Sequence, residues 1–199
     1  MFQSALVEER ALRIVDTAIA LAERGGFEAV RLRDVAAEAG VALGTLYRHF
    51  RSKEDLLVAA LAREVSRLEN HMEKRPATGR DPLERVTAFF AAATRGLCQK
   101  PKLAQAVLRS VASSDHELTE QVSRFHGRVT AMVEKALAGD DLNSTETPSA
   151  GGEFSVALIL QHVWFASLVG WAGGLHDQKT VTAKVRVAAD LLLRGQAKG

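Results

Sequence analysis

Residues 44–50 read Gly44-Thr45-Leu46-Tyr47-Arg48-His49-Phe50, and Ser52-Lys53 follow almost at once. A helix this short cannot carry a wide apolar face, yet it holds a hydroxyl, a phenol, a guanidinium and an imidazole within five positions. Such a helix is suited to contacts outside the protein. The preceding residues 32–41 form a compact amphipathic pattern with a glycine stop. Two short helices about a glycine-containing turn predict a helix-turn-helix, whose second helix enters the DNA major groove.

On both sides of this motif the chain is predicted to be helical. Apolar residues recur every three or four positions from Leu12 to Ala22, and Gly25-Gly26 ends that pattern. Two further starts carry capping signals: Ser52 with Asp55 three residues on, and the run Asp81-Pro82-Leu83-Glu84. More helices are expected after Pro101 and over about 115–138, 153–172 and 178–194, with 139–152 irregular. No run alternates as a strand does, so the predicted fold is all-α.

The composition bears on the number of domains, the cellular location and the kind of nucleic-acid contact. The chain has 199 residues, enough for one large or two small domains, and a single cysteine, Cys98, so no intrachain disulfide can form. The first ten residues lack a secretory pattern, and we expect a reducing, cytoplasmic location. The net charge of +2 excludes a globally basic nucleic-acid coat. Residues 31–53, however, hold five basic and two acidic side chains, a local balance of +3 that suits docking on a few phosphates.

The order and spacing of these landmarks resemble the DNA-binding domain of the TetR family of transcriptional regulators. The matching runs are Gly25-Gly26-Phe27, Arg33-Asp34-Val35-Ala36, Gly40-Val41, residues 44–50 and Ser52-Lys53-Glu54-Asp55-Leu56-Leu57. Within the family the chain is similar to the KstR-type repressors of sterol catabolism in actinobacteria. That similarity rests on Val41-Ala42-Leu43-Gly44-Thr45-Leu46-Tyr47-Arg48, the run Arg63-Glu64-Val65-Ser66-Arg67, and His162-Val163-Trp164-Phe165 leading to Trp171.

The resemblance implies two domains. We expect an N-terminal three-helix DNA-binding domain over residues 1–52, with its motif at about 31–50. Residues 53–199 are expected to form a helical ligand-binding and dimerisation domain, with helix 53–75 as the connector.

Side-chain chemistry suggests how the motif would read DNA. Leu46 and Phe50, four residues apart, can pack the short helix onto its domain. Arg48 can reach guanine O6 and N7, while Thr45 can meet a thymine methyl or a phosphate. By resemblance, phosphate contacts are implied for Thr45, Tyr47, His49 and Lys53, and sequence choice for Leu43, Gly44 and Arg48. With Arg33, the predicted DNA-binding set is Arg33, Leu43, Gly44, Thr45, Tyr47, Arg48, His49 and Lys53.

Two details support contact with phosphate. Ala42, at the expected N-cap, has no side-chain acceptor for the first-turn amides, which leaves them free. Lys53 lies in a first helical turn, where its charge opposes the helix dipole and a phosphate would reverse that penalty. The alternatives are an ordinary surface lysine offset by Glu54 and Asp55, and a structural role for His49.

Apolar side chains of the second half are predicted to line an effector pocket. They come from several helices whose apolar positions extend over more than one face; the alternative is that they simply fill a core. The predicted pocket residues are Phe89, Phe90, Ala93, Leu108, Val111, Phe125, Val129, Met132, Leu160 and Trp164.

Residues 153–172 are apolar nearly all round. A membrane span is one interpretation of such a segment, but Gln161 and His162 at its centre argue against it. By resemblance, the last two helices pair with those of a second copy in a four-helix bundle. The predicted interface residues are Leu168, Trp171, Val185 and Leu192.

No enzyme signature is present. The six histidines show no metal-protease spacing, Cys98 has no activating partner nearby in sequence, and no nucleotide-binding glycine loop occurs.

The sequence therefore predicts a homodimeric, ligand-responsive, sequence-specific regulator of transcription, a repressor that is not an enzyme. Its expected partners are double-stranded operator DNA and a bulky apolar effector, with no metal, no cofactor and no membrane. The KstR-type resemblance implies a coenzyme A thioester of a sterol-derived or long acyl acid. The alternative is a helical interaction module, soluble or membrane-peripheral, in which the helix-turn-helix is only architectural.

Overall fold

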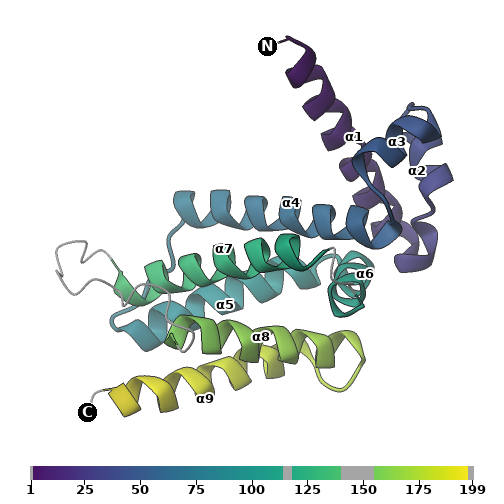
Figure 1. Ribbon diagram of the computed structural model, residues 1–199. Helices are drawn as coiled ribbons and strands as arrows, with labels where there is room; N and C mark the ends of the chain where they lie inside the picture. Colours follow the sequence, from purple (N-terminus) through teal and green to yellow (C-terminus); the bar gives the residue numbers. More distant parts are fainter. Residues whose placement is uncertain (1, 114–117, 140–154, 197–199) are drawn as a thin grey trace. The chain divides into compact units, whose positions relative to one another are not determined.

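The computed structural model describes residues 2–113, 118–139 and 155–196 (Figure 1). Over these ranges the chain forms nine α-helices and one short 3-10 helix and contains no strand, which confirms the all-α prediction. The irregular segment predicted at 139–152 lies, from residue 140 on, outside the described residues. In chain order the elements are α1 (Phe2–Gly25), η1 (Phe27–Ala29), α2 (Leu32–Glu38), α3 (Leu43–His49), α4 (Lys53–Lys74), α5 (Pro82–Cys98), α6 (Pro101–Ala112), α7 (Thr119–Ala138), α8 (Val156–Ala172) and α9 (Gln178–Gln196).

The helix starts obey the capping signals in the sequence. At the start of α4 the Asp55 amide donates to Ser52 Oγ at 3.0 Å, and the Asp55 carboxylate accepts from the Arg51 amide at 2.9 Å. At α5 the Asp81 carboxylate accepts from the Glu84 amide at 2.8 Å, with Pro82 in the first turn. The bonds from the Asp55 and Glu84 amides satisfy groups that a helix start leaves without an intrahelical partner.

A glycine makes the turn between α2 and α3. Gly40 has a φ of 66°, which is costly for any residue with a Cβ. The Gly40 amide bonds to the Ala37 carbonyl, and the Val41 amide bonds back to the Ala36 carbonyl at 2.9 Å. This pair of bonds is a Schellman motif. It closes α2 and turns the chain sharply into α3.

The chain divides into two compact units. The N-terminal unit comprises Met1–Glu64 and Lys100–Ser123, and the C-terminal unit comprises Val65–Gln99 and Arg124–Gly199. Helix α4 contributes to both units, and α6 belongs to the N-terminal one. These units group residues by contact, so the functional boundary after residue 52 stays a prediction.

In the N-terminal unit α1 is the central element. It packs against η1, α2, α3 and α6, while α2 also packs against α3. Its buried side, which includes Ile14 and Ala18, meets a core that contains Leu46 of α3 and Leu56 and Leu57 of α4, all fully buried. Apolar burial on this side fixes α3, so its opposite side is available for contacts.

In the C-terminal unit α9 packs against both α5 and α8 (Figure 1). Phe89 and Phe90 of α5, Val129 of α7 and Leu160 of α8 are at most 1% exposed. Inside this core the Trp164 indole donates to Thr94 Oγ1 at 2.9 Å, so that both polar groups are satisfied. None of the helices in the described ranges has the length and apolar character needed to cross a membrane.

Candidate nucleic-acid interface and effector-binding unit

Helix α3 has one anchored side and one open side. Leu46 is fully buried and Phe50, directly after the helix, is 7% exposed. Tyr47 is 51% exposed, and Gly44 and Arg48 are also exposed. The packing role predicted for Leu46 and Phe50 is confirmed, and it turns polar side chains of α3 to the outside.

Gly44 has no structural task within the chain. A Cβ built at this position meets no atom within 4 Å. Its backbone is helical, so nothing in the fold requires glycine there. A missing side chain on an exposed helix face matters when another surface must come close, as DNA bases do in the major groove.

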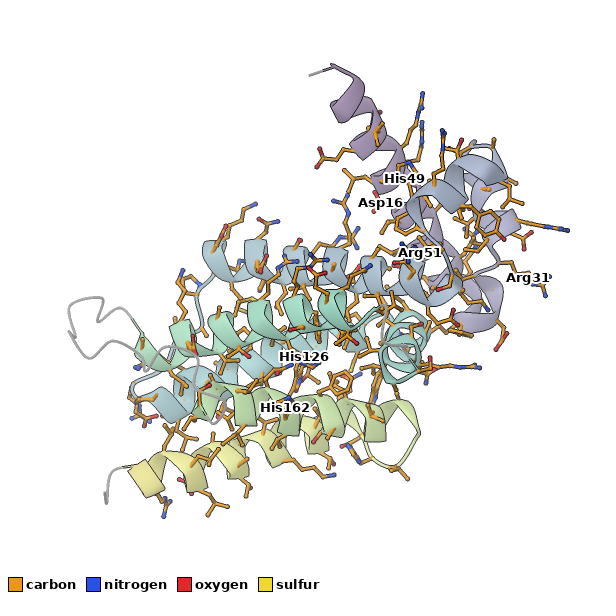
Figure 2. The ribbon with its side chains drawn as sticks, viewed as in Figure 1. Asp16, Arg31, His49, Arg51, His126 and His162 are labelled. Atoms are coloured by element: carbon orange, nitrogen blue, oxygen red, sulfur yellow. The ribbon has the colours of Figure 1, made fainter. Side chains whose placement is uncertain are left out.

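Basic side chains surround this face. Arg33 on α2 and Arg48 on α3 are exposed, and neither forms an ion pair with another described residue. Arg48 donates instead to Thr45 Oγ1 at 3.2 Å, which holds it along its own helix. Arg31 and Arg51, labelled in Figure 2, are exposed as well. The predicted contact set omitted these two arginines, although the local charge count included them.

Lys53 is held more firmly than a surface lysine. Its ammonium lies 4.1 Å from the centroid of the Phe27 ring, donates to the Phe27 carbonyl at 3.2 Å, and lies 3.9 Å from Glu28. Its side chain is 23% exposed. These contacts are with Phe27 and Glu28, and phosphate binding by Lys53 would have to share or break them.

Phe27 also connects to α6. The Arg109 guanidinium stacks 4.0 Å from the centroid of the same ring and pairs with Glu28 at 3.0 Å. Phe27 is thus contacted by two cations, Lys53 of α4 and Arg109 of α6. We call Phe27, Glu28, Lys53 and Arg109 the Phe27 cluster. Sequence reasoning placed Phe27 in the Gly-Gly-Phe landmark but had no signal for Arg109, 82 positions away in the chain.

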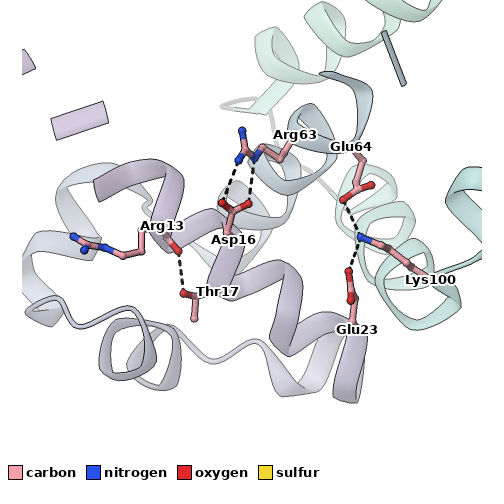
Figure 3. A network of polar contacts seen from close by, with 7 residues as sticks. All are labelled: Arg13, Asp16, Thr17, Glu23, Arg63, Glu64 and Lys100. Atoms are coloured by element: carbon pink, nitrogen blue, oxygen red, sulfur yellow. Dashed lines mark hydrogen bonds and ion pairs between the residues drawn. The ribbon is translucent and has the colours of Figure 1, made fainter. Parts of the chain in front are cut away.

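A second group of polar contacts ties α4 to α1 within the N-terminal unit (Figure 3). Arg63 forms two bonds of 3.1 Å to the Asp16 carboxylate. Lys100, just before α6, pairs with Glu23 at 2.7 Å and with Glu64 at 3.6 Å. The Asp16–Arg63 pair borders an open hollow of about 540 Å³ along α1. These contacts join α1, α4 and α6 beneath the helix-turn-helix.

The predicted pocket residues are distributed over both units. Phe89, Phe90, Ala93, Phe125, Val129, Leu160 and Trp164 are buried in the C-terminal unit, and Met132 there is half-buried. Leu108 and Val111 are buried in the N-terminal unit. Edge-on or tilted aromatic contacts link Phe89 to Phe90 at 5.1 Å and Phe90 to Trp164 at 5.6 Å. The C-terminal unit therefore has an aromatic interior, and the effector pocket predicted there stays a prediction.

Comparisons with known proteins decide the family. The pattern for bacterial regulatory proteins of the tetR family matches residues 14–60, and the pattern for the tetracyclin repressor-like C-terminal domain matches residues 79–192. The transcriptional repressor KstR of Rhodococcus jostii (strain RHA1) is 35% identical over 186 residues, which are 94% of this chain and 84% of that protein. The chain belongs to the TetR family. It is therefore a DNA-binding regulator of transcription, and the predicted resemblance to KstR-type repressors is confirmed.

Solved structures agree with this assignment to the TetR family. A TetR transcriptional regulator from Rhodococcus sp. RHA1 has a TM-score of 0.79 at 27% identity, with 94% of this chain and 97% of that chain covered. FadR of Thermus thermophilus, a repressor of the same family solved with lauroyl-CoA, has a TM-score of 0.70. At 20% identity over 93% of this chain and 94% of its own, that second likeness shows the fold alone.

The residues predicted for a TetR-family dimer interface fall into two groups. Leu168 and Val185 are at most 1% exposed in the single chain, so they can only support an interface from beneath. Trp171 and Leu192 are half-buried. The exposed large apolar side chains on these two helices are Val169, Val187 and Leu191, at 42%, 60% and 66%. The interface predicted on α8 and α9 stays a prediction, and the exposed apolar side chains of these helices are not the ones that the sequence singled out.

Two remaining groups bear on chemistry. Cys98 is 5% exposed, and burial raises the pKa of its thiol to about 11, so it is a neutral core residue. Within the described ranges no cluster of three or more histidine, cysteine, aspartate or glutamate side chains is placed to hold a metal ion.

Proposed function

We propose that this TetR-family chain is a homodimeric repressor that an apolar acyl thioester releases from its operator. The observation that carries the proposal is the open face of α3. There Gly44 leaves room for a close approach, and Tyr47 and Arg48 stand exposed above a buried Leu46.

The proposed DNA contacts divide into two kinds. Arg48 reads guanine, with Leu43 and Gly44 allowing the helix to sit deep in the groove. Arg33, Thr45, Tyr47, His49 and Lys53 contact phosphates, which positions the domain without reading sequence. The exposure of Arg33 and Arg48 supports both assignments, whereas Lys53 can take part only by leaving some of its contacts in the Phe27 cluster.

The proposed effector is a coenzyme A thioester of a sterol-derived or long acyl acid. The identity to KstR supports this choice, as does the lauroyl-CoA bound to the Thermus thermophilus FadR of the same fold. The aromatic interior of the C-terminal unit is chemically suited to an acyl or ring hydrocarbon. The chain then acts by binding alone, without catalysis, and the proposed setting is the cytoplasm.

The proposed mechanism of release uses α4, which contributes residues to both units. A bulky effector among Phe89, Phe125, Val129 and Trp164 displaces this helix and changes the separation of the two reading heads. The heads then no longer match one turn of DNA, about 34–36 Å. A coupling of roughly 1–3 kcal/mol between effector and DNA corresponds to a loss of operator affinity of roughly 5- to 150-fold.

The test is to sequence the DNA fragments that the protein retains, with and without lauroyl-CoA. We expect a palindromic site near its own gene to be retained without the thioester and lost with it. The Arg48→Ala variant serves as the matched control, because Arg48 is exposed and its loss leaves the fold intact. Arg48→Ala should still retain operator fragments, but it should no longer discriminate between bases at one base pair in each half-site. If neither protein enriched any fragment over the others, the alternative of an interaction module with an architectural helix-turn-helix would be favoured instead.

A further inference from the structure

Gln161 is a buried amide that the fold leaves partly unsatisfied. The residue is fully buried on α8, and its amide nitrogen contacts Nδ1 of His126 on α7. Its carbonyl oxygen has no hydrogen-bond partner among the described residues. Two further buried oxygens share this condition, the hydroxyls of Thr87 on α5 and Thr130 on α7. Three helices of the C-terminal unit thus each hold a polar oxygen that no described residue pairs.

Turning the amide does not remove the problem. An amide has two donor hydrogens and one acceptor oxygen, while the His126 ring offers one nitrogen to it. If the oxygen turns toward His126, the NH₂ group becomes the buried orphan instead. Buried polar groups in folded proteins nearly always have partners, so this one needs an explanation. The neighbouring pair of Trp164 and Thr94, one turn along α8, shows that this core does pair polar groups.

The surroundings of His126, the partner of Gln161, are aromatic. His126 lies 4.9 Å from the ring of Phe125 and 5.7 Å from the ring of Phe165, measured between centroids. Figure 2 shows His126 on α7 and His162 on α8, whose rings are 5.8 Å apart. Burial lowers the pKa of His126, although its contact with Gln161 acts in the opposite direction. The imidazole is therefore neutral at pH 7, and a neutral partner suits the group better than a carboxylate or phosphate does.

We propose that Gln161, held by His126, is the polar anchor for one neutral oxygen on the hydrocarbon part of the effector. A hydroxyl on the effector donates to the Gln161 carbonyl. A ketone accepts from the amide after it has turned, while the His126 ring changes tautomer to keep its own bond. The anchor favours an oxygenated effector over bare hydrocarbon of the same shape, because only the oxygenated one pairs the buried amide. This inference rests on the proposed function, which places an apolar effector in this unit.

The first arm of the test needs no effector. The Gln161 carbonyl oxygen gains nothing from its polarity, but the amide nitrogen bonds to His126, so both partners are replaced together. His126→Phe with Gln161→Leu, and His126→Phe with Gln161→Met, should melt at or above the temperature of the parent. The control is Thr94→Val, which removes the acceptor of a satisfied buried bond and should melt several degrees lower. Retained DNA binding shows that each variant is folded. Melting of both double variants as low as Thr94→Val would overturn the proposal, because the Gln161 carbonyl would then be paired by structure or by a buried water.

The second arm compares two probes, lauroyl-CoA and 12-hydroxylauroyl-CoA, by calorimetry. The parent should bind the hydroxylated thioester about tenfold more tightly than lauroyl-CoA, and Gln161→Leu should lose or reverse that preference. An unchanged ratio in the variant contradicts the anchor. If the parent binds neither thioester while the thermal result holds, the acyl thioester of the proposed function is wrong, and the anchor stands for an effector of another skeleton.

Discussion

At the scale of single residues, Gly44 separates the needs of the fold from those of DNA reading. Nothing lies within 4 Å of a Cβ built there, so Gly44→Ala should stabilise the protein by about 0.5–1 kcal/mol by favouring the helix. The same methyl group would stand on the face that we assign to the bases. We expect operator binding to weaken about tenfold, as measured by fluorescence anisotropy.

The control for Gly44 is Gly96, an exposed glycine of α5 with equally open surroundings. Gly96→Ala should raise the melting temperature similarly and leave operator affinity unchanged. If Gly44→Ala bound the operator as tightly as the parent, α3 would not lie in the major groove, because a methyl group added to a helix face that contacts bases must weaken binding.

We expect His126 to lower the stability of the folded protein at acidic pH. Its pKa in the folded chain is lowered, chiefly by burial and also by His162, whereas the unfolded chain titrates at about 6.5. The unfolded state therefore binds more protons, and the free energy of unfolding should fall as pH drops through about 6.5 and level off below the folded pKa.

Thermal melts from pH 8 to pH 5 measure this effect. In His126→Phe the part of the slope near pH 6.5 should disappear, because the half-buried imidazole that resists protonation is gone. His71→Phe, at an exposed position of α4, should keep it. A parental slope in His126→Phe would assign the acid sensitivity to another group.

At the scale of elements, Lys53 joins the start of α4 to η1 through the Phe27 cluster. We expect Lys53→Met to weaken binding to all DNA sequences alike and to flatten the salt dependence, because a phosphate contact is lost. It should also lower stability by about 0.5–1 kcal/mol, the usual worth of a partly exposed cation over an aromatic ring. Arg48→Ala, which removes no such contact, should change DNA binding without changing the melting temperature. Unaltered stability in Lys53→Met would show that the cluster has no energetic role.

The same elements show what sequence can predict. Starts of α4 and α5 were predicted correctly because caps act over three or four residues, as Ser52 and Asp81 do. The order of the helices followed from local periodicity and from glycine stops. Contacts across the fold could not be predicted, because the pairing of Arg109 with Phe27 or of Gln161 with His126 depends on how the helices pack. On a helix as uniformly apolar as α8, the sequence could not show which side chains face the core. Leu168 is buried there, whereas Val169 is exposed.

At the scale of the whole molecule, the exposed side chains of α8 and α9 test the dimer. Val187 and Leu191 lie four residues apart on α9, so they share one exposed face. Replacing both, as Val187→Glu with Leu191→Arg, should give folded monomers in sedimentation and weaken operator binding, because one head contacts only one half-site. Leu12→Arg, at an exposed leucine of α1 in the other unit, should stay dimeric. A double variant that sediments like the parent would place the interface elsewhere.

Binding of effector and operator must be reciprocal across the molecule. An effector can release DNA only if its affinity differs between the DNA-competent conformation and the other one. The factor by which lauroyl-CoA weakens operator binding must then equal the factor by which saturating operator DNA weakens lauroyl-CoA binding. For a coupling of about 1–3 kcal/mol, both factors lie between roughly 5 and 150, measurable by calorimetry with and without DNA.

Val129→Trp fills the fully buried site of Val129 in the C-terminal unit and should abolish thioester binding while operator affinity persists. Release of Val129→Trp from DNA by the thioester would place the sensing site outside this interior, and unequal factors in the parent would mean that the thioester acts on DNA binding through aggregation rather than through reversible binding.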